Sequence, residues 1–275
     1  MLPKAHRVRL SLAVLAAMLL SPTLGLAAPV DLNTWTAESY AAVAGFGAGV
    51  WNVSQSGDTV TQTVNGQPTL FYSDFSALGT DVRGRARVGG SGDNDYFGFA
   101  IGFRPGDTTN SAANYLLVDW KQGTQPFDFG PPSNTPGSTA FEGLAVSRVT
   151  GIPTADEFWG HTDFAQDAGG GLTELARGNT LGSTGWADNT DYVFQFVFQT
   201  TGLKVFVDGV LQLDVAGNFS NGRMAFYNFS QANVTYSAFT RDPAPPVPGP
   251  APLPGPATGL LLAAGLLALV ARSRS

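Results

Sequence analysis

Three consecutive side chains with oxygen atoms, Asp93, Asn94 and Asp95, directly follow the glycine-rich turn Gly89–Gly92. Calcium binds about six to eight oxygens from carboxylates, amides, carbonyls and water. The segment is therefore a candidate calcium site. The alternative is a polar hairpin tip in which the same side chains make Asx-turn hydrogen bonds to their own backbone.

A fourth candidate ligand, Asp119, lies inside the apolar segment Asn114–Lys121. A buried carboxylate without a partner would be costly there. A metal ion, Lys121 or a nearby arginine would each remove that cost. The predicted calcium ligands are Asp93, Asn94, Asp95 and Asp119, whereas the residues that would bind any further ligand stay unknown.

No set of residues favours an enzyme. The sequence has no cysteine, which excludes thiol nucleophiles and zinc–thiolate sites. Neither the glycosidase pattern Glu-x-Asp-x-x-Glu nor the Gly-x-Ser-x-Gly elbow occurs. His161 with Asp163 and a serine would imitate a triad, but a lone histidine close to Trp159 is more often a hydrogen-bonded structural residue. We therefore expect a non-catalytic protein.

The charge distribution limits the partners. The 275-residue chain has a net charge of −6, from 15 basic and 21 acidic residues. Five of the basic residues lie in terminal segments without acids, so ten basic and 21 acidic residues remain between them, a charge of −11. Nucleic acids need a basic surface and are not expected as partners. Divalent cations and neutral polymers fit better.

The central segment reads as a succession of strands separated by turn residues. Ten segments show the alternation or composition of strands: Asp58–Val64, Val82–Val88, Tyr96–Phe103, Asn114–Lys121, Gly143–Val149, Tyr192–Gln199, Leu203–Val207, Val210–Val215, Arg223–Asn228 and Val234–Phe239. Asp208-Gly209 suits a tight hairpin turn. No segment between the termini shows a sustained helical period. The predicted fold is all-β, a two-sheet antiparallel jelly-roll sandwich.

Large aromatic residues are expected to fill its core. Phe194, Phe196 and Phe198 alternate onto one strand face, and Phe97, Phe99 and Phe103 approximately onto another. The tryptophans are expected to be packed, although an exposed one would stack on a sugar: Trp51, Trp120, Trp159 and Trp186. The alternating arginines Arg83, Arg85 and Arg87 suggest a solvated face with acidic neighbours. The alternative is a site for an anionic polymer.

Both ends look like sorting signals. Residues 1–28 have basic residues, the apolar run Leu10–Leu20 and small residues near Ala27, as in a secretory signal peptide. Residues 243–256 form a proline-rich linker. Residues 257–275 form an apolar segment with a basic end, which predicts a transient inner-membrane anchor. A permanent single-span anchor is the alternative.

The C-terminal segment resembles the bacterial PEP-CTERM sorting tails in their VPLPA-like variant. The matching residues are Ala251–Gly255, the apolar run and the two final arginines. The glutamate of Pro-Glu-Pro is missing. The resemblance implies recognition by an exosortase-type enzyme, removal of the tail and delivery to the surface of a Gram-negative cell or to its exopolysaccharide.

The central segment resembles the C-terminal domain of thrombospondins from about Trp51 to Phe239. The resemblance rests on motifs in a shared order: Val60–Asn65, Pro68–Phe75, Asp93–Phe103, Asn114–Gln122, Gly143–Val146, Trp159–Thr162, Gly185–Tyr192, Gly222–Phe226 and Phe229–Gln231. It implies a concanavalin-like, L-type-lectin-like sandwich with bound calcium, in a family associated with adhesion and extracellular matrix.

Two departures from that family limit the resemblance. Residues 29–50 contain no aspartate-rich calcium repeat, and the cysteines of the animal domain are absent. Integrin binding is therefore not expected. The segment Gln125–Ala140, rich in proline, glycine, serine and threonine, is predicted to be a surface loop that shapes a ligand groove.

Residues 29–242 are thus expected to form a calcium-binding, lectin-like module that mediates adhesion or associates with a surface glycan or exopolysaccharide. The alternative is a structural surface protein whose partners are matrix proteins and which has no glycan site. A glycan-active hydrolase is the least favoured reading.

Overall fold

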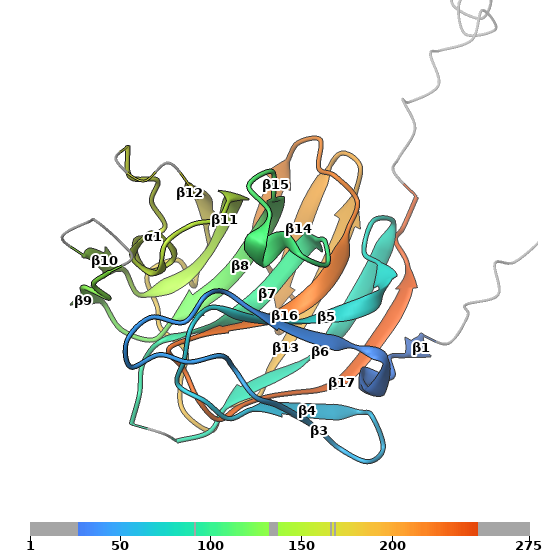
Figure 1. Ribbon diagram of the computed structural model, residues 1–275. Helices are drawn as coiled ribbons and strands as arrows, with labels where there is room; N and C mark the ends of the chain where they lie inside the picture. The colour runs from blue at the N-terminus through green and yellow to red at the C-terminus, as the bar shows by residue number, and fades with distance from the viewer. Residues whose placement is uncertain (1–26, 91, 132–136, 166, 168, 247–275) are drawn as a thin grey trace, which may run out of the picture.

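The computed structural model describes residues 27–246, apart from 91, 132–136, 166 and 168. Its strands form two large antiparallel sheets packed face to face (Figure 1). This confirms the predicted all-β, two-sheet antiparallel sandwich. All ten predicted strands are present, and Tyr96–Phe103, Asn114–Lys121 and Tyr192–Gln199 have the predicted bounds.

The first sheet consists of strands in the order β15-β14-β13-β6-β17-β4-β3, with β1 paired to β17. Their bounds are β15 Val210–Ala216, β14 Gly202–Val207, β13 Tyr192–Gln199, β6 Thr80–Val88, β17 Val234–Pro243, β4 Thr59–Gln62, β3 Trp51–Val53 and β1 Ala28–Pro29. Because β1 pairs with β17, the two ends of the described chain lie side by side (Figure 1).

The second sheet has the order β12-β11-β8-β7-β16-β5-β2. Its strands are β12 Gly170–Arg177, β11 Gly143–Gly151, β8 Asn114–Lys121, β7 Tyr96–Phe103, β16 Arg223–Phe229, β5 Thr69–Ser76 and β2 Thr36–Ser39. A separate ribbon pairs β9, Gln125–Phe127, with β10, Ser138–Ala140. The short helices are α1 Ala155–Gly160 and the 3-10 turns η1 Leu32–Thr34 and η2 Asp107–Thr109.

The core between the sheets is aromatic, as alternation predicts. The Phe99 ring lies 4.8 Å from the Phe194 ring and 4.6 Å from the Phe196 ring. The sequence predicted that Phe103 shares a face with Phe97 and Phe99, and this prediction is wrong. Gly102 has a φ of +86° and the β7–β16 register shifts beside it, so alternation is broken and Phe103 points to the opposite side.

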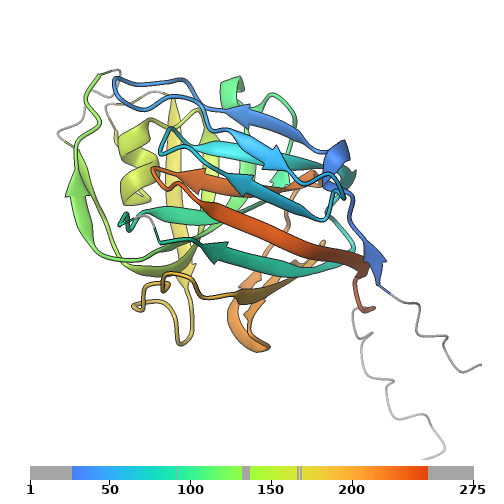
Figure 2. The same cartoon turned by 90° about the horizontal axis from the view of Figure 1, so that it is seen from below.

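That opposite side is a second core, which covers the outer face of the second sheet. Tyr96, Tyr115, Tyr227 and Phe229 pack there against Phe158 and Trp159 of α1. Figure 2 shows α1 and the β9–β10 ribbon together at one end of the molecule. The second sheet is therefore buried on both faces, and every residue of β7 is buried.

Helix α1 is too short for its period to be seen in the sequence, and it forms through its ends. Thr154 and Glu157 make a reciprocal capping box. At the other end His161 has a φ of +49°, which turns the chain out of the helix and aims its side chain at the second sheet.

The tryptophans and arginines have mostly structural surroundings. Trp120, Trp159 and Trp186 are buried, and Trp51 stacks on Phe71 with ring centroids 5.4 Å apart. Arg83 pairs with Asp81 at 3.2 Å and Arg87 with Asp191 at 3.9 Å. These acidic neighbours are what the solvated-face reading predicts. Asp208 and Gly209 both have positive φ, as a tight hairpin turn between β14 and β15 requires.

The Tyr236 hydroxyl joins the two sheets through their shared core. It donates toward the Tyr227 carbonyl, 2.8 Å away, lies 3.0 Å from Asn228 Oδ1 and accepts from the Gly98 N–H at 3.4 Å. The ring stacks on Phe226 at 4.3 Å.

We predict that Tyr236→Phe lowers the free energy of unfolding by about 1–3 kcal/mol, because buried polar groups lose their partner while ring packing is kept. Urea unfolding measures this loss. Tyr72→Phe, at a half-buried position outside the core between the sheets, is the matched control and should change stability by less than about 0.5 kcal/mol. Equal effects of the two changes would contradict the role of the Tyr236 hydroxyl.

Candidate functional site

A pocket of about 200 Å³ opens where β7, β9, α1 and the turn after β16 meet. We call it the Asp93 pocket. It combines four aromatic rings with carboxylate, amide and hydroxyl groups, and its lining residues are Phe46, Asn65, Asp93, Asp95, Gln125, Phe127, Phe129, Trp159 and Ser230. Such a mixture of apolar walls and a few convergent polar groups is typical of small-ligand sites.

A buried ammonium group contacts three of the residues that line the pocket. Lys121 is fully buried at the end of β8, paired across the sheet with Tyr96 of β7. Its Nζ donates to Asp95 Oδ1 at 2.7 Å, to the Asn94 carbonyl at 2.8 Å and to Asn94 Oδ1 at 2.9 Å. Gln125 Oε1 lies at 3.3 Å. Burial lowers the pKa of Lys121, and the Asp95 carboxylate opposes that shift.

A ring completes the surroundings of this ammonium. Nζ of Lys121 lies 4.6 Å from the Trp159 ring centroid, within the range of a cation–π contact. The Trp159 indole N–H donates to the Gln125 carbonyl at 3.0 Å. One cation therefore links the start of β7, the end of β8, the ribbon and α1.

Asp93 lies at the side of the pocket, half-buried. Its Oδ2 accepts from Asn65 Nδ2 at 2.6 Å, and Ser230 Oγ lies 3.1 Å from Asn65 Oδ1. Burial and then the negative charge of Asp95 raise the pKa of Asp93 to about 6. Lys121 makes its ion pair with Asp95, and its positive charge also acts on Asp93.

Asp119 belongs to a different group of residues. It is fully buried on the outer face of the second sheet, and its Oδ2 lies 3.0 Å from His161 Nε2. The other ring nitrogen lies 3.3 Å from Glu174 Oε2, and Glu174 also pairs with Arg177 at 2.9 Å. Positive and negative groups alternate from Asp119 through His161 and Glu174 to Arg177.

The ionisation of this chain follows from its charges. Burial disfavours the charged imidazolium, but the carboxylates of Asp119 and Glu174 outweigh it and raise the pKa of His161 to about 9. Burial opposes ionisation of Glu174 too, yet hydrogen bonds from His161 and Arg177 lower its pKa to about 2. Burial raises the pKa of Asp119, and His161 acts against that shift.

The four predicted calcium ligands do not converge on one point. Asn94 and Asp95 give their oxygens to Lys121, and Asp119 gives one to His161. In the part of the chain that the structure describes, no cluster of three or more acidic or histidine side chains has the arrangement of a metal site. Protein cations bind Asn94, Asp95 and Asp119, so these three side chains as arranged do not form a calcium site.

The sequence offered a metal ion, Lys121 or a nearby arginine as the partner of Asp119. In the structure His161 pairs with Asp119, and Lys121 pairs with Asp95. Sequence reasoning did not single out Asn65 or Ser230 as pocket residues. They lie in loops far apart in the chain, and only the pairing of the neighbouring strands brings them together.

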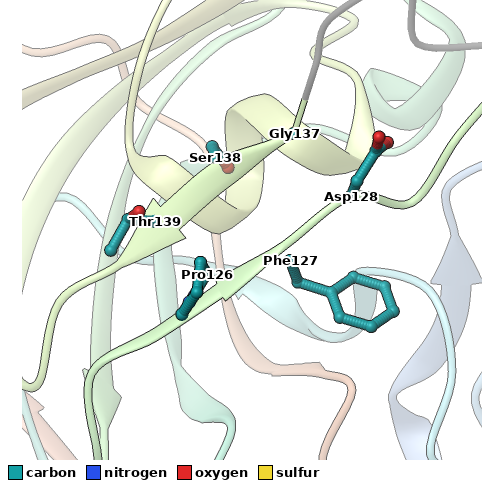
Figure 3. Close-up of a pocket in the computed structure, with 6 residues that line it drawn as sticks. All are labelled: Pro126, Phe127, Asp128, Gly137, Ser138 and Thr139. Atoms are coloured by element: carbon teal, nitrogen blue, oxygen red, sulfur yellow. The ribbon is translucent and has the colours of Figure 1, made fainter.

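Part of the predicted loop Gln125–Ala140 is the β9–β10 ribbon, which does line the pocket through Gln125 and Phe127. Residues 132–136 lie outside the described part. Figure 3 shows a second hollow on the ribbon, lined by Phe127 of β9, by Asp128 directly after it, and by Ser138 and Thr139 of β10. Phe127 is 37% exposed and borders both hollows.

The match to a family model decides the relationship of this chain. The model of the thrombospondin C-terminal region matches residues 47–242, which include the strands of both sheets from β3 onward and the pocket lining apart from Phe46. The chain belongs to the thrombospondin C-terminal family. The resemblance seen in the sequence motifs is thereby confirmed, and the domain described here is a thrombospondin C-terminal domain.

Curated relatives are animal thrombospondins. Thrombospondin-2 of Gallus gallus is 27% identical over 209 residues, which are 68% of this chain and 16% of that protein. Human thrombospondin-3 is 25% identical over 202 residues, 68% of this chain and 19% of the relative. The thrombospondin C-terminal domain thus spans less than a fifth of the length of these relatives.

Several solved structures align with this chain at low sequence identity. VIP36, exoplasmic/lumenal domain in a Ca²⁺/Man3GlcNAc-bound form, aligns with a TM-score of 0.48 and 12% identity over 82% of this chain and 90% of its own. The carbohydrate-binding module CBM66 from Bacillus subtilis aligns with a TM-score of 0.47 and 12% identity, over 76% of this chain and 95% of its own. Galectin LEC-6 of Caenorhabditis elegans aligns with a TM-score of 0.38 and 12% identity, over 70% of this chain and 99% of its own.

The predicted signal peptide, residues 1–28, and the predicted sorting tail, residues 257–275, lie almost entirely outside the described residues, as does most of the linker. Within the described part, none of the helices has the length and apolar character needed to span a membrane.

The ionisation of His161 makes the stability of the protein depend on pH. Because the pKa of His161 in the folded state is raised from 6.5 to about 9, its contribution to the free energy of unfolding is fully present below pH 6.5 and is lost as the pH rises through about 9. The loss should be on the order of 3 kcal/mol. Glu174 acts in the opposite direction, and its contribution is lost only as pH falls from 4.5 toward about 2.

We predict that urea unfolding of the protein across this alkaline range shows the loss, whereas His161→Asn shows a flatter profile. Asparagine accepts the left-handed backbone at this position and does not titrate. Parallel pH profiles for the two proteins would exclude His161 as the titrating group.

Proposed function

We propose that this thrombospondin C-terminal domain is a non-catalytic, lectin-like module that binds a glycan of the cell surface or of the exopolysaccharide in the Asp93 pocket. The observation that carries this proposal is the composition of the pocket. Hydrogen-bonding groups of Asp93, Asn65 and Gln125 converge there beside the exposed ring of Phe127.

This combination suits a sugar ring. Sugar hydroxyls donate to carboxylate oxygens and exchange hydrogen bonds with amides, while the apolar face of the ring packs on an aromatic side chain. The volume of about 200 Å³ lies below the ~300 Å³ at which pockets for drug-sized ligands begin. The pocket is therefore suited to a single residue of a longer polymer.

The protonation states support a binding role without catalysis. His161, whose pKa is about 9, carries its proton at neutral pH and is fixed by carboxylates on both ring nitrogens. It cannot accept a proton from a nucleophile. The second carboxylate of the pocket, Asp95, forms an ion pair with Lys121.

Calcium takes no part in the proposed binding. The oxygens that would bind it at Asp95 already bind Lys121, and an ion there would have to displace the ammonium. The bound polymer would instead be held by direct hydrogen bonds and by ring packing in the pocket.

The proposed place of action is outside the cell. Export through the signal peptide, transient anchoring in the inner membrane by the tail and removal of that tail by an exosortase-type enzyme remain our proposals, supported by the terminal sequences. An adhesive or matrix role would follow if the released domain holds an exopolysaccharide close to the cell.

We predict that the purified protein binds fragments of its host exopolysaccharide saturably, and that Phe127→Ala weakens binding about tenfold, corresponding to ~1.4 kcal/mol. Isothermal titration calorimetry in EDTA and again in calcium should give the same affinity within about twofold, because no metal step is involved. Phe141→Ala removes an exposed ring that does not line the pocket and serves as the matched control.

Calcium-dependent binding would contradict the metal-free mechanism. Absence of any saturable glycan binding, combined with concentration-dependent self-association, would favour the structural alternative, in which the partners are matrix proteins.

A further inference from the structure

Another pocket, of about 140 Å³, lies beside the start of α1. We call it the Gln67 pocket. Its walls are mostly apolar and include Tyr40, Val43, Pro68, Ile152, Pro153 and Phe158. None of the described residues that line it carries a charge. Its volume is less than half of the ~300 Å³ at which pockets for drug-sized ligands begin, so it suits a small neutral group.

Gln67 brings an unused hydrogen-bond donor to these apolar surroundings. It is only 2% exposed, and its Nε2 has no hydrogen-bond partner among the residues that the structure describes. The other polar side chains of the pocket are already bonded. The Tyr40 hydroxyl lies 2.9 Å from that of Tyr115, and Thr154 Oγ1 accepts from the Glu157 N–H at 3.3 Å. A buried amide is costly unless it is hydrogen-bonded, so a ligand that offers an acceptor would be stabilised there.

The backbone around the pocket is fixed by hydrogen bonds. The Gln67 N–H donates to the Gly47 carbonyl at 2.8 Å, and the Tyr40 N–H donates to the Pro68 carbonyl at 2.9 Å. These bonds join the segment before residue 48 to the one that carries the amide. The capping box at Thr154 fixes the start of α1, which contributes further lining. The pocket is thus formed in advance, and the side chain of Gln67 can turn its N–H toward a ligand.

The Gln67 pocket is a neighbour of the Asp93 pocket. Three segments each contribute one residue to the Asp93 pocket and one to the Gln67 pocket: Phe46 and Val43, Asn65 and Gln67, and Trp159 and Phe158. The Phe46 N–H also donates to the Val43 carbonyl at 3.0 Å. A glycan with one residue in the Asp93 pocket would therefore bring another residue to the Gln67 pocket.

We propose that the Gln67 pocket binds the acetamido group of an N-acetylated sugar residue in the same polymer. The acetamido carbonyl accepts from Gln67 Nε2, and its methyl group packs on the apolar walls. A charged group is disfavoured, because none of the described lining residues offers an opposite charge. This inference rests on the proposed glycan function and specifies its substrate class.

The test compares β-1,4-linked N-acetylglucosamine oligomers with glucose oligomers of the same linkage and length, by calorimetry. Both are neutral, and they differ in the acetamido group. We expect the N-acetylated oligomer to bind at least about tenfold more tightly, equivalent to ~1.4 kcal/mol.

Gln67→Met keeps the unbranched side chain and removes the amide. It should reduce the preference for the N-acetylated oligomer to about twofold or less. The melting temperature should stay the same or rise, because a buried donor without a partner is removed. Gln55→Met is the matched control, because it makes the same change at an exposed position between β3 and β4. It should leave the preference intact.

Ala41→Phe tests the pocket by filling it. Ala41 is exposed and lines the pocket, so a ring there should occupy the space and abolish the preference without a large loss of stability. Ala42→Phe adds the same ring at the next position, which is also exposed but does not line the pocket. This control should keep the preference.

Each other outcome has a defined meaning. Equal affinity for the two oligomers, with saturable binding, would overturn the acetamido inference and leave the glycan function standing. A preference that survives both Gln67→Met and Ala41→Phe would overturn the assignment to the Gln67 pocket. No binding of these oligomers or of any exopolysaccharide fragment would overturn both proposals. Tighter binding of an acetyl-lysine peptide would overturn the assignment to a sugar.

Discussion

Burial of the second sheet on both faces is the constraint on which the rest of the structure depends. One face packs on the first sheet, and the other is covered by α1, the β9–β10 ribbon and the segment around Tyr40. A charged side chain on the covered outer face has no water to stabilise it and must find an opposite charge within the protein. Lys121 and Asp119 both lie on this face. Lys121 pairs with Asp95, and Asp119 pairs with His161.

The partner that each charge finds determines the shape of the site. Lys121 binds the segment Asn94–Asp95, the ribbon and the Trp159 ring, and so holds in place residues that line the pocket. His161, placed by the end of α1, neutralises Asp119 and holds the helix on the sheet. The stability of the covering layer and the arrangement of the pocket thus have the same origin.

The strands could be predicted from sequence because their alternation and turn residues are local signals, and β7, β8 and β13 were predicted with their observed bounds. The opposite orientation of Phe103 could not be predicted from sequence, because it depends on a bulge at Gly102. Helix α1 was missed because six residues give no detectable period, and its formation depends on its caps and on the packing of Phe158 and Trp159.

The site was predictable only in part, for the same reason. Asp93 and Asp95 were singled out as candidate calcium ligands, and both line the pocket. Their counter-charge comes from a residue 26 positions away from Asp95, and that of Asp119 from one 42 positions away. Strand pairing and the covering helix create both contacts. Oxygen-rich sequence alone cannot tell a calcium ion from a buried lysine.

The most direct test of this account is a double-mutant cycle on Lys121 and Asp95, measured by urea unfolding. Lys121→Met keeps the side-chain length but leaves two carboxylates without their cation, and should cost about 3–5 kcal/mol. Adding Asp95→Asn should restore at least about half of that loss, because the buried charge is then removed. Additive losses, or a Lys121→Met variant within about 1 kcal/mol of the unchanged protein, would contradict the claim that this buried ammonium organises the site.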